Sequence, residues 1–300
     1  MTAHREKCTI LENKKIAPGH FVLRMCSPRI SKAARPGQFV QVLCSDSFDP
    51  LLPRPFSFLT ATTKDFSILY QVVGKGTHLL AQAQKGDALW VVGPLGNGFA
   101  TYFSLRGAPV SKRPGPSLLR PIAVRGNMIF VLIGGGVGIP PLYHLAQHFL
   151  KLKPRINPEN IQVFLGARTQ SLLLCEKDFK KLGIKVEVAT EDGSKGAKGY
   201  VTKMAEDFVR HKDPRTLRVY ACGPTSMLKA VSLISEKYGV RTEVSVEVPM
   251  ACGFGACLGC AIRVKEKRTK MRGKKGGKNH RFAMACTEGP VFLADQILWD

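Results

Sequence analysis

The sequence lacks any hydrophobic run long enough to cross a membrane. Its longest apolar stretch, residues 128–142, is interrupted by four glycines, whereas a membrane-spanning helix needs about 20 consecutive apolar residues. Residues 1–7 are mostly polar, so the start of the sequence shows no apolar core of a secretory signal. We therefore expect a soluble, cytoplasmic protein that makes no contact with membranes.

The sequence also lacks the cysteine pattern of a disulfide-linked protein. It has nine cysteines, an odd number, and five of them are scattered without paired spacing. An odd count without a secretory signal is typical of proteins from a reducing compartment. The scattered cysteines are Cys8, Cys26, Cys44, Cys175 and Cys222.

Acidic residues are scarce in this chain. It has 22 Asp and Glu against 45 Lys and Arg, which gives a formal net charge of +23. Residues 100–127 hold five basic residues and no acid, and residues 263–281 hold ten basic residues and one acid. Glycine and proline in these stretches predict surface loops. Basic runs bind nucleic acids or acidic partners, but no aromatic residue interleaves the charges of 263–281, so we expect solvated loops and no nucleic-acid binding. An acidic partner protein is the alternative.

Two hydrophobic patterns divide the chain of 300 residues. In residues 1–100, short apolar runs separated by glycine and proline predict an antiparallel β-barrel. We expect residues 101–127, which are basic and rich in proline and glycine, to form a linker insertion between these two parts. In residues 128–243, buried apolar strands alternate with helical stretches, which predicts an α/β domain with a parallel sheet. Residues 244–300 are expected to form a small C-terminal module.

The four remaining cysteines carry the strongest signal in the sequence. Cys252, Cys257 and Cys260 follow the spacing C-x4-C-x2-C, and Cys286 follows at a distance. This spacing is typical of the thiolates that hold a plant-type [2Fe–2S] cluster. The alternative is a structural zinc site, which usually combines two short Cys-x2–4-Cys pairs. The three bunched cysteines and the remote fourth favour the iron–sulfur cluster.

A run of glycines predicts a nucleotide site. Gly134, Gly135, Gly136 and Gly138 lie between a buried apolar strand and a helix. This position directs backbone N–H groups and a helix N-terminus toward a phosphate. The run departs from the G-x-G-x-x-G fingerprint, and the alternative is a tight turn without a ligand.

A second turn follows the fourth strand of the predicted parallel sheet, at the edge where ligands bind. It contains Cys222, Gly223 and Pro224. Cys222 is a candidate to lie near a nicotinamide, although a free cysteine is more often a small buried residue. Acids in residues 190–194 are candidates to contact a ribose, and Arg168 is a candidate to accept a 2′-phosphate.

The predicted barrel carries two further candidates. Arg54, close to Ser57 on a strand, is suited to pair with a diphosphate. Gly74 to Thr77 form a second candidate phosphate turn. Each signal is weak alone, because surface arginines are usually solvated.

Taken in order, these motifs resemble the ferredoxin–NADP reductase superfamily. The C-terminal cysteines and residues 288–292 narrow the resemblance to the electron-transfer subunits of dihydroorotate dehydrogenase B. The resemblance covers nearly the whole chain except the two basic stretches. The motifs are Arg54-Pro-Phe-Ser57, Gly74-Lys-Gly-Thr77, Gly93-Pro-Leu-Gly-Asn-Gly-Phe99, Gly134-Gly-Gly-Val-Gly138 and Cys222-Gly-Pro224.

The resemblance implies three cofactors and a partner. FAD would bind Arg54, Pro55, Phe56, Ser57, Leu69, Tyr70, Gln71, Gly76 and Thr77. NAD, favoured over NADP, would bind Gly134, Gly135, Gly136, Gly138, Cys222, Gly223 and Pro224. The cluster would bind Cys252, Cys257, Cys260 and Cys286. A separate FMN-containing catalytic subunit would pass electrons through the cluster and FAD to NAD+ in pyrimidine synthesis, in a heterotetramer with two copies of each subunit.

Two other interpretations stay open at this point. A diaphorase-type subunit of a sulfite reductase or a hydrogenase carries similar motifs. A zinc-stabilised nucleic-acid-binding protein would use the basic stretches, but it would leave the flavin and nucleotide motifs unexplained.

Overall fold

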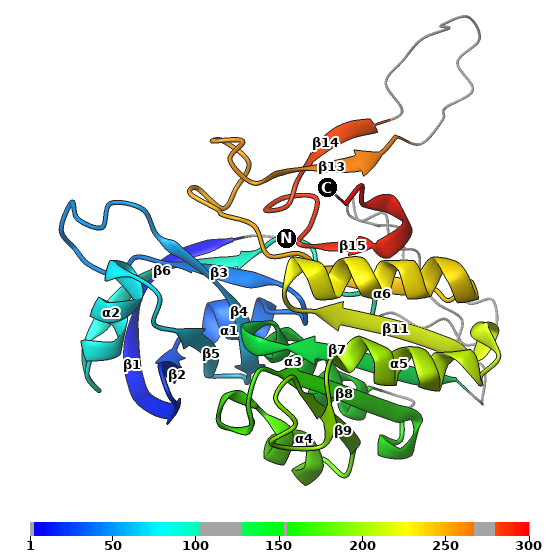
Figure 1. Cartoon of the computed structure of the whole chain (residues 1–300). Coiled ribbons are helices and arrows are strands. Elements are labelled where there is room, and N and C mark those ends of the chain that lie inside the picture. Colours follow the sequence, from blue (N-terminus) through cyan, green and yellow to red (C-terminus); the bar gives the residue numbers. More distant parts are fainter. Residues whose placement is uncertain (1–2, 102–127, 153–154, 267–279, 300) are drawn as a thin grey trace, which may run out of the picture.

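The structure is a computed structural model that describes residues 3–101, 128–152, 155–266 and 280–299. Within these residues a closed barrel and a larger sheet with helices lie side by side, and a C-terminal excursion rises above them (Figure 1). The loops predicted for residues 102–127 and 267–279 lie outside the described residues. Among the described helices, none has the length and apolar composition needed to cross a membrane.

The barrel is antiparallel and closes in the strand order β1-β2-β5-β4-β3-β6, as predicted. Alternating residues face its interior, where Ile10, Leu23 and Met25 are almost fully buried, because side chains of a strand point to opposite faces in turn. The strands are β1 (His4–Ala17), β2 (His20–Cys26), β3 (Phe39–Val42), β4 (Arg54–Ala61), β5 (Asp65–Gln71) and β6 (Ala88–Leu95). Two helices, α1 (Pro28–Ala33) and α2 (Lys75–Gln82), complete this part of the chain.

The second layer is a seven-stranded sheet in the order β10-β9-β8-β7-β11-β12-β15, parallel except for β15. This confirms the predicted α/β fold. The central strand β7 is buried along most of its length, which explains its unbroken apolar sequence. The strands are β7 (Ile129–Gly135), β8 (Ile161–Ala167), β9 (Lys185–Thr190), β10 (Ala197–Lys198), β11 (Leu217–Cys222), β12 (Thr242–Ser245) and β15 (Val291–Leu293).

Helices connect these strands and cover the sheet. They are α3 (Ile139–Lys151), α4 (Glu176–Lys181), α5 (Val201–Arg210) and α6 (Thr225–Tyr238). Short 3-10 turns lie at Gly136–Gly138, Pro158–Asn160, Gln170–Leu172, Pro214–Thr216 and Ala294–Gln296. Helix α3 also packs against the barrel, where the rings of Phe58 and His144 lie 6.2 Å apart.

The C-terminal excursion leaves the sheet after β12 and returns to it at β15. Residues 246–260, called the cluster loop below, lead into a hairpin of β13 (Ala261–Lys265) and β14 (His280–Met284). Strand β15 then pairs with β12, with Val291 opposite Ser245. Strand β12 spans the boundary expected at residue 243, so the C-terminal part of the chain and the parallel sheet share one core.

Glu243 is a buried carboxyl group where the barrel joins the sheet. Its Oε2 accepts a hydrogen bond of 2.9 Å from the backbone N–H of Ala100. Burial raises the pKa of Glu243 to about 7, and the Ala100 N–H and the charges of Arg241 and Arg218 only partly oppose this rise. The neutral acid is therefore the favoured form in the folded protein below neutral pH.

This raised pKa predicts a pH-dependent stability. Between the ordinary value of 4.5 and about 7, the folded chain binds more protons than the unfolded chain, so the free energy of unfolding falls as the pH rises through this window. Glu243→Gln keeps an acceptor for Ala100 and removes the titration. We expect the variant to gain on the order of 2 kcal/mol over wild type between pH 5 and pH 8, as measured by urea unfolding. Parallel stability curves for the two proteins would contradict the assignment.

Candidate functional site

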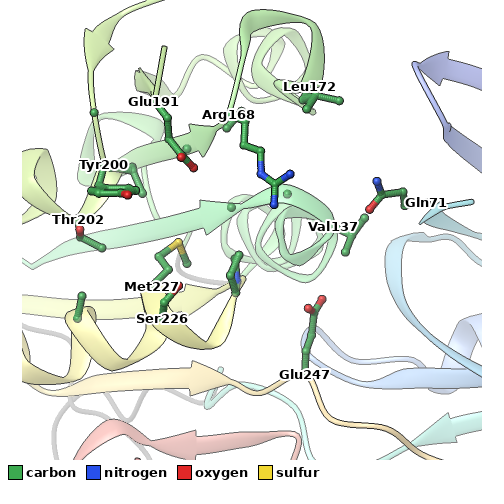
Figure 2. A pocket seen from close by; sticks show the side chains of 18 of the residues that line it. Gln71, Val137, Arg168, Leu172, Glu191, Tyr200, Thr202, Ser226, Met227 and Glu247 are labelled. Carbon is green, nitrogen blue, oxygen red and sulfur yellow. The ribbon is translucent and has the colours of Figure 1, made fainter. Parts of the chain in front are cut away.

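One cavity of the described structure, called the larger cavity below, has a volume of about 670 Å³. It opens at the carboxyl ends of β7, β8 and β9, between the first turns of α5 and α6 and the barrel strand β5 (Figure 2). This is the edge of a parallel sheet where ligands bind. Gly135, Gly136 and Pro224, all predicted nucleotide-binding residues, line it.

The other predicted glycines lie behind the cavity wall and allow two turns to touch. A Cβ atom on Gly138 would lie 2.4 Å from the backbone nitrogen of Gly223. A Cβ atom on Gly134 would lie 3.0 Å from Ile139 Cγ1. Only glycine at position 138 therefore permits this approach between the turn after β7 and the turn after β11.

Two charged residues of opposite sign point into the larger cavity. Figure 2 shows the carboxylate of Glu191 and the guanidinium of Arg168 entering from the ends of neighbouring strands. Tyr200 lies beside them with 71% of its surface exposed. The cavity thus offers an acceptor, a cation and an open aromatic ring at one end.

A smaller cavity of about 440 Å³ lies between the barrel and the ends of β11 and β12. The structure brings almost all of the predicted flavin residues together in its wall. Gly76 lies just behind, where a Cβ atom would be 3.3 Å from Arg54 Nε. The predicted residues that line the cavity are Arg54, Pro55, Phe56, Ser57, Leu69, Tyr70, Gln71, Thr77 and Cys222.

The two cavities meet at Gln71, Val137 and Glu247, which line both. The sequence analysis missed Glu247, although its place just beyond β12 at the carboxyl edge of the sheet is a usable signal. Its side chain lines both cavities and is accessible to solvent there, and desolvation by the surrounding protein raises its pKa. Burial also raises the pKa of Cys222 far above its usual range, so this residue is a neutral thiol.

The four predicted cluster cysteines lie in two pairs. The backbone N–H of Cys257 donates to Cys252 Sγ at 3.4 Å, and the sulfur atoms of Cys260 and Cys286 are 3.1 Å apart. Within the described residues, no three His, Cys, Asp or Glu side chains are grouped closely enough to hold one metal ion. Two pairs suit a two-iron cluster, in which four thiolates serve two iron atoms, better than a zinc ion, which needs four ligands around one point.

Backbone donors favour the thiolate form at one of these ligands. Burial opposes ionisation of Cys252, but N–H groups of Cys257, Phe254 and Ala256 donate to its sulfur and lower its pKa to about 6. The thiolate is the form that binds metal. The donor set of the loop therefore fits the predicted cluster.

The cluster loop rests on the barrel beside the smaller cavity. Met250 lines this cavity and precedes Cys252 by two residues. The Gln41 side chain donates to the Met250 carbonyl at 3.4 Å. Asn97, at the end of the last barrel strand, donates to the carbonyls of Thr287 and Glu288 at 2.9 and 3.1 Å. The cysteines are thus held next to the cavity that contains the predicted flavin residues.

Two family models match parts of this chain. One, described as the oxidoreductase NAD-binding domain, matches residues 132–233. The other, described as the iron-sulfur cluster binding domain of dihydroorotate dehydrogenase B, matches residues 247–298. A protein of Desulforamulus reducens named dihydroorotate dehydrogenase B (NAD(+)), electron transfer subunit, is 36% identical over 95% of both chains. The chain belongs to this family of electron transfer subunits. A relative of the same name from Caldanaerobacter subterraneus is 36% identical over 98% of both chains.

Solved structures share the fold of this member of the dihydroorotate dehydrogenase B electron transfer family. A chain from the structure of an NADH-dependent reduced ferredoxin-NADP oxidoreductase has a TM-score of 0.74 and 31% identity, covering 98% of this chain and 90% of that one. The cytochrome b5 reductase domain of Ulva prolifera nitrate reductase has a TM-score of 0.59 at 20% identity, covering 79% and 93%, and shares the fold.

The comparisons confirm the predicted oxidoreductase class and cofactors. The matched domains support NAD and the iron–sulfur cluster, and the reductase fold supports FAD. The name electron transfer subunit implies a separate catalytic partner. None of these comparisons supports the zinc-stabilised nucleic-acid-binding alternative.

Proposed function

We propose that the chain carries electrons between an FMN-containing dihydroorotate dehydrogenase subunit and NAD+, in a heterotetramer with two copies of each subunit that serves pyrimidine synthesis. The observation that carries this proposal is the continuity of the site. The two cavities meet at Gln71, Val137 and Glu247, and Met250 of the cluster loop lies in the wall of the smaller one. When bound, FAD supplies hydride exchange with NAD, and the iron–sulfur cluster supplies one-electron exchange.

The chain's own residues have distinct tasks in this proposal. Arg54 would pair with the FAD diphosphate, because a guanidinium forms paired hydrogen bonds to phosphate oxygens. The N–H groups of Gly135 and Gly136 and the first turn of α3 would hold the NAD pyrophosphate. Met250 would stand between the flavin cavity, which it lines, and the ligand Cys252 two residues further on. Four free cysteines as cluster ligands would suit work in the cytoplasm, a reducing compartment.

The test is reconstitution with the catalytic subunit of the same organism. We expect the two subunits together, but neither alone, to form orotate from dihydroorotate with NAD+ as acceptor. If a chain that contains flavin, iron and acid-labile sulfide binds the catalytic subunit and supports no NAD+ reduction, the proposal is wrong.

Glu191 is proposed to select NAD over NADP. An acid at this strand end accepts hydrogen bonds from the ribose hydroxyls of NAD, and its charge repels the 2′-phosphate of NADP. Glu191→Gln removes the charge, so we expect the preference for NADH over NADPH in dye reduction to fall about tenfold. Glu159→Gln, on an exposed turn, is the matched control and should leave the preference unchanged. An unchanged ratio in Glu191→Gln would instead assign the selection to other residues.

A second function is favoured by the 31% identical chain of the NADH-dependent reduced ferredoxin-NADP oxidoreductase, which covers 98% of this sequence. In that case ferredoxin would replace dihydroorotate as the redox partner. The same assay separates the two functions, since reduced ferredoxin can be supplied in place of dihydroorotate and its catalytic subunit.

A further inference from the structure

One face of the β13–β14 hairpin combines basic and aromatic side chains. In its register Arg263 lies opposite Phe282, and Lys265 lies opposite His280. Directly opposed residues of an antiparallel pair project on the same face, and so do residues two apart along a strand. These four side chains therefore share a face, which we call the hairpin face. Arg263, Lys265 and Phe282 are exposed, with 59% of Phe282 accessible.

The opposite face fixes the hairpin to the rest of the molecule. Val264 and Ala283 are buried, and the backbone N–H of Leu298 donates to the Arg263 carbonyl at 3.0 Å. Arg281 forms an ion pair of 2.6 Å with Glu288. The hairpin face is thus held in place before any partner arrives, which limits the entropy lost on binding.

The hairpin face lies within a few residues of the cluster ligands. Strand β13 begins directly after Cys260, and β14 ends two residues before Cys286. In the cluster loop Cys257 is exposed. Its neighbours Phe254 and Leu258 are 63% and 62% accessible. Figure 1 shows the loop and the hairpin projecting together from one end of the molecule.

We infer that the hairpin face, with Phe254 and Leu258, docks an acidic surface of the catalytic subunit. The inference rests on the proposed function and adds the chemistry of the contact. Exposed apolar side chains beside Cys257 suit the desolvated centre of an interface, and basic residues suit its polar rim. Complementary charge raises the association rate and fixes the orientation of the partner.

The charge of the hairpin face argues for an acidic partner. The described face carries Arg263 and Lys265, and residues 263–281 contain ten basic residues against one acid. Nucleic acid is also anionic, but a docked partner here would lie beside the thiolates, as electron transfer through the cluster requires. The observations therefore favour a redox protein, and nucleic-acid binding becomes an outcome of the test.

The test reverses the charge of the hairpin face. The full-length, cofactor-containing variant R263E/K265E is titrated calorimetrically with the catalytic subunit at about 50 mM and about 300 mM salt. We expect at least about tenfold weaker binding at low salt, and a smaller loss of affinity on adding salt than in wild type. NADH–dye reduction and the visible spectrum should match wild type. K14E/K15E, at exposed positions of β1, makes the same charge change elsewhere and should bind like wild type.

The outcomes separate this inference from the proposed function. Wild-type affinity and salt dependence in R263E/K265E overturn the inference and leave the proposed function standing. Failure of the wild-type chain to bind the catalytic subunit at either salt concentration overturns both. If wild type binds a single-stranded oligonucleotide more tightly than the catalytic subunit, the face is a nucleic-acid site instead. If the charge-reversed variant loses its visible spectrum, R263Q/K265Q repeats the test; it should bind the catalytic subunit more weakly than wild type does, and wild-type affinity in it overturns the inference.

Discussion

Replacing Cys257 by serine is expected to remove the cluster and stop electron flow to the catalytic partner. Loss of residues that merely support a metal ligand costs about 10- to 100-fold in affinity or activity, so loss of a ligand should lower orotate-coupled NAD+ reduction more than about 100-fold. NADH–dye reduction should persist, because the residues that line the two cavities include none of the four cluster cysteines. Iron, acid-labile sulfide and the visible spectrum measure the loss directly.

The matched control for this substitution is Cys26→Ser. Cys26 is an exposed cysteine at the end of β2 in the barrel, so the same chemical change should leave iron, sulfide and both activities at wild-type levels. A Cys257→Ser protein with full iron and sulfide content would refute the assignment of this ligand. Loss of dye reduction as well would show that the cluster loop supports the flavin cavity.

Gly138→Ala is expected to impair NAD binding severely. The added Cβ would lie 2.4, 2.5 and 2.6 Å from backbone atoms of Gly223 and Cys222. Backbone atoms cannot rotate away as a side chain does, so the two turns must separate. Overpacking of this kind costs typically about 1–3 kcal/mol of stability. We expect the KM for NADH to rise at least about tenfold, because the displaced turns include the cavity residues Gly136 and Pro224.

Steady-state dye reduction and thermal unfolding test this expectation. Gly74→Ala, on the barrel turn predicted to bind the flavin phosphate, is the control for the KM for NADH alone, because no heavy atom lies within 4 Å of its added Cβ and its backbone is extended. The control should keep the wild-type KM for NADH. A wild-type KM and unfolding midpoint in Gly138→Ala would mean that the two turns can separate without cost, and that their close packing is not needed for the nucleotide site.

The sequence predicts the parts of this site that depend on local spacing. The glycine run after β7 and the closely spaced cysteines of the cluster loop can each be recognised from residues close together in the sequence. The structure places each of them after the strand that the sequence predicts. The flavin residues on β4 and β5 are predicted only through the family resemblance, because an arginine near a serine does not by itself indicate a flavin site. Their convergence on one cavity comes from the closure of the barrel.

Other features depend on distant pairings that no local pattern encodes. Asn97 contacts carbonyls about 190 residues away in the chain, so its part in holding the turn that follows Cys286 appears only in the folded structure. Glu247 reaches the junction of the cavities because β12 is placed beside β11. Phe282 lies one residue beyond the basic stretch 263–281 and joins its charges only through the hairpin register.

The pairing of Ser245 with Val291 makes residues 246–290 a detour that leaves and re-enters the sheet at one place. A change in the length of such a detour shifts no strand, and each doubling of a flexible loop costs only about 0.6 kcal/mol in closure entropy. The sheet therefore keeps its strand order and register when the length of residues 246–290, which carry the cluster ligands, changes. The hairpin can therefore carry a charged extension toward a redox partner while the sheet strands that border the two cavities keep their places.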